Sequence, residues 1–289
     1  MHPYLFSVDL PFLDEPFHLR SFGALVAVAF LIGAHILQRL AARYGDNPMG
    51  DPARYSRITM WVLFGVFGGA RGMYVAVEIL RGSPTGASYV AEPWTALFFW
   101  EGGLVMYGGL IGGIAAGLWC ARREGVRSWN ALDLGLTAAF FAQAVGRVGC
   151  LLVGDDYGAR VPPDLPVLPF PIALRVPDPL PPGSLFDPAQ AGEVVWATQP
   201  WMSINALLIG ILALTILRRR RYAGQVSLWV ILVYAVTRFA IEHFRGDSVR
   251  GKWFGDALST SQILSIVAAL GALWLLYSFR ERRDEPRPR

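Results

Sequence analysis

Three arginines lie inside long apolar stretches of the chain, where a charged side chain is costly. They are Arg71, Arg147 and Arg238. Placing a guanidinium at the centre of a lipid bilayer costs about 2.5–3.5 kcal/mol on insertion scales. Each of these arginines therefore calls for an anionic partner, and a guanidinium suits a phosphate because it can donate two parallel hydrogen bonds. The pattern indicates either a compensating partner within the protein, such as a carboxylate, or a function that involves an anion such as a phosphate.

Two more charged residues follow Arg238 at helical spacing. Glu242 and Arg245 stand four and seven residues after it, so the three side chains share one helix face. Arg238 and Glu242 can pair along that face. This pattern is open to two interpretations, which are a structural ion pair that joins helices and a functional site.

A short stretch after Arg147 combines that arginine with two carboxylates. Asp155 and Asp156 stand at the outer end of the apolar run that contains Arg147. Three interpretations are open: the two aspartates only mark the helix end, they act in acid–base chemistry, or they bind a metal. Two adjacent aspartates without a nearby histidine are weak evidence for a metal, and we predict none.

A tyrosine that is followed by two glycines is a further candidate for a functional residue. Tyr107 precedes Gly108 and Gly109 in an apolar run. Small residues allow close helix packing, which explains the later glycines of this run. The phenol of Tyr107 either bonds a backbone carbonyl or belongs to a site.

The composition indicates what must position these residues. Hydrophobic residues make up 54% of the 289 residues and charged residues 17%, against about 25% charge in soluble domains. A bilayer core needs about 20 apolar residues per helix. Seven apolar runs predict an all-α integral membrane protein with seven transmembrane helices, at residues 21–38, 58–80, 96–120, 131–153, 201–217, 226–244 and 258–279.

The basic residues orient these helices. With the N-terminus outside, inner segments carry 16 of the 26 basic residues, outer segments carry seven, and three lie inside the apolar runs. Positive charge favours the cytoplasmic side, so we expect an N-out, C-in topology. Because the arginines are spread over short loops rather than gathered in one patch, orientation explains them better than nucleic-acid binding. No nucleic-acid partner is expected.

One segment departs from the helical pattern. Residues 154–200 hold 11 of the 20 prolines, and proline disrupts helices. We expect an extracytoplasmic head between the fourth and fifth helices, inserted in a single membrane domain of residues 1–289. Its apolar content favours a packed head over a disordered linker. Residues 280–289 are expected to form a basic cytoplasmic tail, and Cys120 and Cys150 lie in apolar runs, which argues against a disulfide.

Taken together, these motifs resemble the bacterial prolipoprotein diacylglyceryl transferase family along nearly the whole chain. The glycine–arginine frame of the family signature is kept at Gly146, Arg147, Gly149, Gly154 and Gly158. The sixth apolar run matches a family motif at Tyr234, Arg238, Phe239, Glu242, Phe244 and Arg245. Further similar segments are 69–72, 108–112, Asp133 and 258–265.

The resemblance implies an enzyme of the bacterial cytoplasmic (inner) membrane with its active site facing the extracytoplasmic side. Such enzymes transfer the diacylglyceryl group of phosphatidylglycerol to the lipobox cysteine thiol of preprolipoproteins, and glycerol phosphate leaves. No cofactor is implied, and we expect a monomer embedded in membrane lipid. The implied catalytic residues are Arg147, Arg238, Tyr107, Asp155 and Glu242. The implied substrate-binding residues are Arg71, Arg245, Gly108, Gly109, Gly146, Gly149, Cys150 and Gly158.

The chain departs from the family pattern beside the expected thiol acceptor. Tyr107 stands where the family has a histidine, Cys150 and Val153 replace two asparagines, and Asp155 replaces a glutamate. The arginines expected to hold the phosphate are kept. The sequence thus describes a divergent member, and two alternatives are an accessory homologue that binds phospholipid or lipoprotein precursor and a transferase with another acceptor. An anion transporter is less favoured, because no paired interrupted spans repeat between the halves of the chain.

Overall fold

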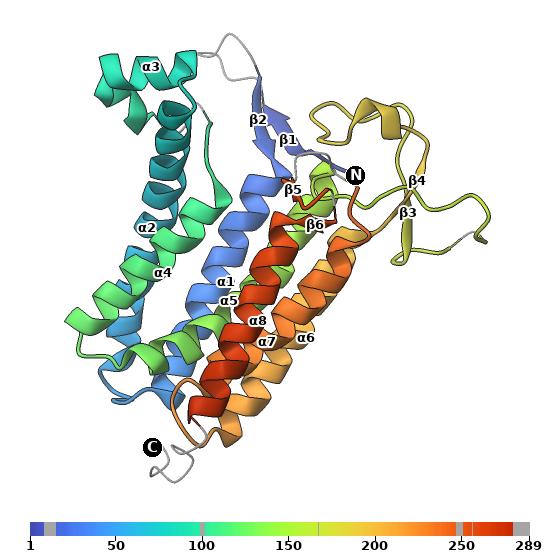
Figure 1. Cartoon of the computed structure of the whole chain (residues 1–289). Helices are drawn as coiled ribbons and strands as arrows, with labels where there is room; N and C mark the ends of the chain where they lie inside the picture. Colours follow the sequence, from blue (N-terminus) through green and yellow to red (C-terminus); the bar gives the residue numbers. More distant parts are fainter. Residues whose placement is uncertain (9–15, 99–101, 167, 247–250, 256, 280–289) are drawn as a thin grey trace. The chain divides into compact units, whose positions relative to one another are not determined.

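The computed structural model describes residues 1–8, 16–98, 102–166, 168–246, 251–255 and 257–279. Within these ranges the chain forms eight α-helices and three two-stranded antiparallel sheets (Figure 1). Two compact units can be distinguished, Met1–Ile36 with Gly135–Pro288, and Leu37–Leu134. The expected basic tail, residues 280–289, lies outside the described residues.

Six of the helices in the described part of the chain are long and apolar enough to cross a membrane. They are α1 (Ser21–Tyr44), α2 (Asp51–Leu80), α5 (Ser128–Val153), α6 (Thr198–Arg219), α7 (Gln225–Glu242) and α8 (Thr260–Ser278). The prediction of a helical, multi-pass membrane protein is confirmed. The first, second, fourth, fifth, sixth and seventh apolar runs fall on these helices.

The first unit is built around α5, α6, α7 and α8. Figure 1 shows α7 packed between α6 and α8. Large apolar side chains on α8 point away from the protein, and Val267, Leu270 and Trp274 are each at least 62% exposed. Continuous exposed apolar surface of this kind fits contact with lipid rather than with water.

The start of α8 is fixed by a capping box. The Ser259 side chain accepts a hydrogen bond from the Gln262 backbone, and the Gln262 side chain accepts one from the Ser259 backbone. This arrangement satisfies two backbone donors that the first helical turn leaves free. It also fixes the position of Ser259, which takes part in the candidate site.

Between α5 and α6 the chain folds without an α-helix in its described residues. Strands β3 (Ala173–Arg175) and β4 (Val194–Trp196) pair antiparallel, and a short 3-10 helix, η3 (Pro188–Gln190), lies between them. A buried apolar cluster packs this segment. It consists of Tyr157, Val176, Phe186 and Val195.

Two smaller hairpins complete the first unit. Strand β1 (Tyr4–Val8) pairs with β2 (Phe17–Arg20) before α1 begins. Strand β5 (Lys252–Trp253) pairs with β6 (Leu258–Ser259) between α7 and α8. The second hairpin returns the chain to the end of α7, so that Ser259 meets Glu242.

The second unit contains α2, α3 (Pro84–Ala91), the 3-10 helix η1 (Pro93–Leu97) and α4 (Met106–Arg123). Helices α2 and α4 pack closely through facing glycines. A side chain at Gly69 would lie 2.3 Å from the Gly108 carbonyl oxygen, and one at Gly112 would lie 2.2 Å from that of Gly65. Small residues at these crossing points let the two backbones approach.

The third apolar run is not the continuous helix that we predicted over residues 96–120. The structure has η1 up to Leu97, and α4 begins only at Met106. Gly102 and Gly103 take positive φ angles of 94° and 71° in between. Glycine adopts this left-handed backbone without steric cost, which ends any helix there. The periodicity of apolar residues does not report such a break.

Candidate active site

Two arginines from different helices converge on one carboxylate. Arg147 lies in the last turns of α5, Asp156 in the turn after α5, and Arg245 just beyond α7. Arg147 Nη1 donates to Asp156 Oδ2, and Arg245 Nη2 donates to Asp156 Oδ1. The side chains of Arg147 and Arg245 are only 15% and 6% exposed. Two segments far apart in the sequence thus share one anion position.

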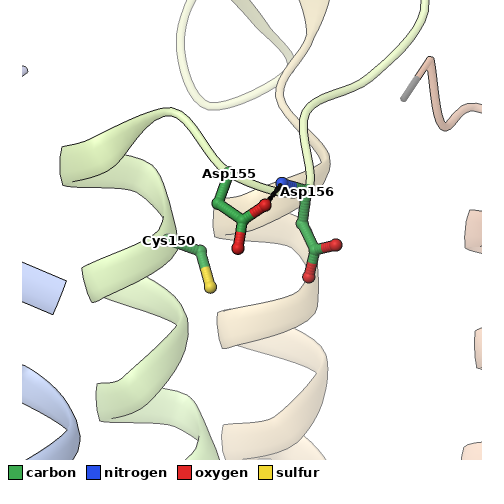
Figure 2. A group of neighbouring side chains, drawn as sticks. All are labelled: Cys150, Asp155 and Asp156. Atoms are coloured by element: carbon green, nitrogen blue, oxygen red, sulfur yellow. Dashed lines mark hydrogen bonds between the residues drawn. The ribbon is translucent and has the colours of Figure 1, made fainter. Parts of the chain in front are cut away.

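The backbone of Asp156 is held at both ends. Its N–H donates to Asp155 Oδ1 at 2.9 Å, as Figure 2 shows, and its carbonyl accepts from the hydroxyl of the fully buried Thr198 at 2.8 Å. Its φ angle is +54°. Aspartate is one of the few residue types with a side chain that tolerates this region. The turn therefore holds the backbone of Asp156 beside the two arginines.

Short backbone contacts join this turn to the end of α7. Ala159 N–H donates to the Phe244 carbonyl at 2.8 Å, and Gly246 N–H donates to the Tyr157 carbonyl at 3.1 Å. A side chain at Gly158 would lie 2.2 Å from the Trp196 carbonyl oxygen. Gly158 is thus required for a close approach of two backbones. Its predicted substrate-binding role stays a prediction.

A second ion pair lies on α7. Arg238 Nη1 is 2.7 Å from Glu242 Oε2, and the Glu242 side chain is fully buried. Ser259 Oγ donates to Glu242 Oε1 at 2.9 Å. The pairing of Arg238 with Glu242 that the sequence predicted is therefore present. We call Arg147, Arg238, Arg245, Asp155, Asp156 and Glu242 together the arginine–carboxylate cluster.

The two neighbouring aspartates of this cluster have opposite electrostatic properties. Burial tends to raise the pKa of Asp156, but the charges of Arg147 and Arg245 outweigh it, so that this pKa is lowered. Burial raises the pKa of Asp155, and the negative charge of Asp156 adds to that effect. Asp156 therefore stays ionised more readily than an ordinary aspartate, whereas Asp155 holds a proton more readily.

Cys150 lies beside both aspartates. Its Sγ atom and one oxygen of each carboxylate are all within 4.8 Å of one another (Figure 2). Such a group has the ligand types of a metal site, but each Asp156 oxygen already accepts from a guanidinium. The arrangement is better described as part of the arginine–carboxylate cluster.

Arg71 has a different environment, in the second unit. Its donors reach four backbone carbonyls and one phenol: Ala96 O at 2.8 Å, Gly102 O at 2.7 Å, Gly103 O at 3.4 Å, Thr95 O at 3.3 Å and Tyr89 Oη at 3.3 Å. The rings of Tyr74 and Tyr89 flank its charge. Buried backbone carbonyls outside helices and strands must find hydrogen-bond donors elsewhere in the protein. Arg71 supplies them for the break before α4.

The glycines predicted to bind substrate pack against neighbouring helices. A side chain at Gly108 would lie 2.3 Å from the Gly69 carbonyl oxygen, and one at Gly109 would lie 3.2 Å from that of Val66. In the first unit, Gly149 faces Phe22 and Leu25 of α1, and Gly146 faces Ala29 more loosely. The half-buried Tyr107 begins the first turn of α4, in the second unit.

The structure therefore brings together Arg147, Asp155, Arg238, Glu242, Arg245 and Cys150 in the first unit. It places Arg71, Tyr107, Gly108 and Gly109 in the second. The sequence did not indicate Asp156 as an arginine partner, Thr198 as a partner of the Asp156 backbone, or Ser259 as a partner of Glu242. The Asp–Asp pair at the helix end was the sequence signal for Asp156, and Ser259 lies in the family-like segment 258–265, whereas Thr198 carried no signal.

These features define a class of protein, a helical multi-pass membrane protein with buried arginines that surround carboxylates at the end of its spans. The comparisons with known proteins name the family. Residues 10–278 match the prolipoprotein diacylglyceryl transferase family, and the chain belongs to it. The resemblance inferred from the motifs is confirmed.

Relatives of similar length support this membership. A phosphatidylglycerol–prolipoprotein diacylglyceryl transferase of Nostoc sp. is 30% identical over 98% of this chain and 94% of its own. The protein of the same name from Synechococcus elongatus is 30% identical over 94% of this chain and 87% of its own. That of Halalkalibacterium halodurans is 28% identical over 98% and 90%.

Proposed function

We propose that this chain transfers the diacylglyceryl group of phosphatidylglycerol to the cysteine thiol of a prolipoprotein. The observation that carries the proposal is the shared anion position of Arg147 and Arg245. Two nearly buried guanidiniums point at one place, which Asp156 fills in this structure. A lipid phosphate has the charge and the oxygen geometry to use the same donors.

The chemistry explains why several arginines are needed. The thiol sulfur attacks the glyceryl carbon next to the phosphate ester, the new S–C bond forms and the C–O bond breaks. The bonding electron pair leaves with the phosphate oxygen of glycerol phosphate. The phosphate changes from a singly charged diester to a nearly doubly charged monoester. Donors fixed around the place where charge develops stabilise the transition state, which is the role of Arg147 and Arg238, with Arg245 beside them.

The proton of the thiol needs an acceptor. We assign this role to Asp155, because its pKa is raised by burial and by the charge of Asp156. A base with a raised pKa takes a proton more readily. Glu242 acts differently, because it is fully buried against Arg238 and Ser259. It is a positioning residue that holds Arg238 in place.

We also propose that α4 is a seventh transmembrane crossing. Its 18 residues span about 27 Å at 1.5 Å per residue, close to the thickness of a bilayer core. Arg57, near the start of α2, donates to Glu124, just past the end of α4, at 2.8 and 2.5 Å. The C-terminal end of α4 therefore lies beside the N-terminal end of α2, so the two helices run in opposite directions.

Seven crossings give the topology that the basic residues favour, with the N-terminus outside and the C-terminus inside. The arginine–carboxylate cluster lies around the C-terminal end of α5, whereas the inner basic segment at Arg122, Arg123 and Arg127 precedes the N-terminal end of α5. We therefore assign the cluster to the extracytoplasmic side of the bacterial inner membrane.

A transfer assay with the full-length protein tests the function. Detergent-purified protein is mixed with phosphatidylglycerol and a lipobox peptide, and lipidated peptide is measured by mass spectrometry. Arg147→Ala and Arg238→Ala should each lower the rate about 100-fold or more, as expected for loss of a transition-state donor. Arg160→Ala is the control, because Arg160 pairs with Glu193 on the exposed surface.

Complementation of a strain depleted of its own transferase gives a second test. The wild-type chain should restore growth and the Arg147→Ala chain should not, at equal membrane expression. If the wild-type chain shows neither transfer nor complementation but still binds phosphatidylglycerol, the accessory function is correct and the transferase proposal is wrong.

A further inference from the structure

Asp156 makes the contacts that a bound phosphate would make. One of its oxygens accepts from Arg147 and the other from Arg245. A phosphate bound between these arginines would offer them two oxygens in the same way. The carboxylate and the substrate phosphate therefore compete for the same donors.

Asp156 is also placed so that it can leave these donors without unfolding its turn. Its backbone is held by Asp155 and Thr198, and its side chain is 23% exposed. Rotation about the side-chain bonds alone moves the carboxylate away from the arginines. Because part of the carboxylate is exposed, it has room to move outward.

Among the described residues, the arginine–carboxylate cluster holds equal numbers of guanidiniums and carboxyl groups. Three guanidiniums, those of Arg147, Arg238 and Arg245, face three carboxyl groups, those of Asp155, Asp156 and Glu242. An incoming phosphodiester adds one negative charge. Glu242 is fully buried against Arg238, so Asp156 is the ion-paired carboxylate that is free to give up its place.

We propose that Asp156 is an internal counter-ion that holds the arginines while the site is empty and competes with the phosphate of substrate and product. This inference rests on the proposed transferase function. The product matters most, because glycerol phosphate carries more negative charge than the lipid and would be held more tightly by free arginines. Competition by Asp156 weakens binding of both and speeds release of the product.

The size of the effect follows from the occupancy of the arginines. The apparent dissociation constant rises in inverse proportion to the fraction of molecules with a free site, so a site that is free about one-tenth of the time binds about tenfold more weakly. Removing the charge of Asp156 should therefore tighten binding by about tenfold. A merely structural role would weaken binding instead.

The main variant is Asp156→Asn. Asparagine tolerates a positive φ angle as aspartate does, so the turn at φ +54° is kept. Glu193→Gln is the matched control, because it makes the same carboxylate-to-amide change at the exposed pair with Arg160. The measurements are binding of glycerol 1-phosphate by calorimetry, binding of phosphatidylglycerol in nanodiscs, and the KM and kcat of transfer.

We expect Asp156→Asn to bind both probes about tenfold more tightly, to lower KM for the lipid and to strengthen inhibition by glycerol 1-phosphate. Glu193→Gln should match the wild type. Unchanged or weaker binding in a folded Asp156→Asn protein would overturn the proposal. Asp156→Gly, which also accepts the positive φ angle, replaces Asn if that variant unfolds, and the same outcomes apply.

The test separates this inference from the proposed function. If Arg147→Ala binds both probes as well as the wild type, the arginines do not hold phosphate, and both proposals fail together. If Arg147→Ala weakens binding and Asp156→Asn also weakens it, the phosphate site stands and the competing counter-ion is wrong.

Discussion

Arg238 and Glu242 lie one turn apart on α7 and form an ion pair with 2.7 Å between Nη1 and Oε2. Ser259, brought back by the β5–β6 hairpin, donates to the other oxygen of Glu242 at 2.9 Å. The carboxylate thus links the C-terminal end of α7 to the start of α8. This link makes the position of Arg238 depend on two elements at once.

Glu242→Ala should be strongly destabilising, because it leaves the guanidinium of Arg238 buried without its carboxylate. Removing one partner of a buried pair costs about 3–5 kcal/mol, which thermal unfolding in detergent measures. The double variant Arg238→Met with Glu242→Leu should regain much of that stability, since no charge is left unpaired, yet remain inactive. Recovery of activity in the double variant would show that Arg238 has no part in the reaction.

Arg71→Lys should lower stability although it keeps the charge. Lysine has three donors on a single nitrogen and no planar fork, so it cannot reach the carbonyls of Thr95, Ala96 and Gly102 together. We expect a loss of about 3 kcal/mol, since hydrogen bonds to charged groups are worth about 1.5–3 kcal/mol each. Arg54→Lys, on the first turn of α2, is the control. A raised KM for the lipid at unchanged stability would instead support the substrate-binding role predicted from the sequence.

Neighbouring glycines on α2 give a matched test of helix packing. Gly69→Ala should destabilise the protein by about 1–3 kcal/mol, the usual cost of overpacking, because its Cβ would lie 2.3 Å from the Gly108 carbonyl oxygen. Gly68→Ala has nothing within 4 Å and should be neutral or stabilising by up to about 1 kcal/mol. Equal effects of the two substitutions on thermal unfolding would contradict the α2–α4 contact.

The pH dependence of transfer should report Asp155. A general base acts when it is deprotonated, so activity should rise with pH through the pKa of Asp155, which lies above its ordinary value of 3.8 because of burial and the charge of Asp156. Asp155→Asn should remove this acidic limb together with most of the rate. An unchanged pH profile in Asp155→Asn would exclude Asp155 as the base.

Asp156 should make the stability of the folded protein depend on pH. Its folded-state pKa is lowered by Arg147 and Arg245 despite its burial. A group with a lowered folded-state pKa stabilises the fold above its unfolded pKa, and that stability is lost as pH falls through the folded-state value. Wild-type protein should therefore lose more stability than Asp156→Asn as the pH falls below 3.8, the ordinary pKa of aspartate. Equal losses in acid denaturation would mean that the ion pairs contribute nothing.

The sequence by itself determined the membrane class, six of the helices and the family. Long apolar runs report spans directly, because each helix must satisfy its own backbone hydrogen bonds in lipid. The spacing of Arg238 and Glu242 also determined their ion pair, since residues four apart in a helix are neighbours. These are local properties that need no knowledge of the fold.

Only the tertiary structure decided which groups meet between elements. Asp156 joins Arg147 to Arg245, a residue 89 positions away in the chain, and a left-handed turn held by Thr198 directs it there. The break before α4 depends on Arg71, which satisfies carbonyls 24 to 32 residues later. Such partners follow from how turns and helices bring distant segments together, and no periodic pattern in the sequence encodes that geometry.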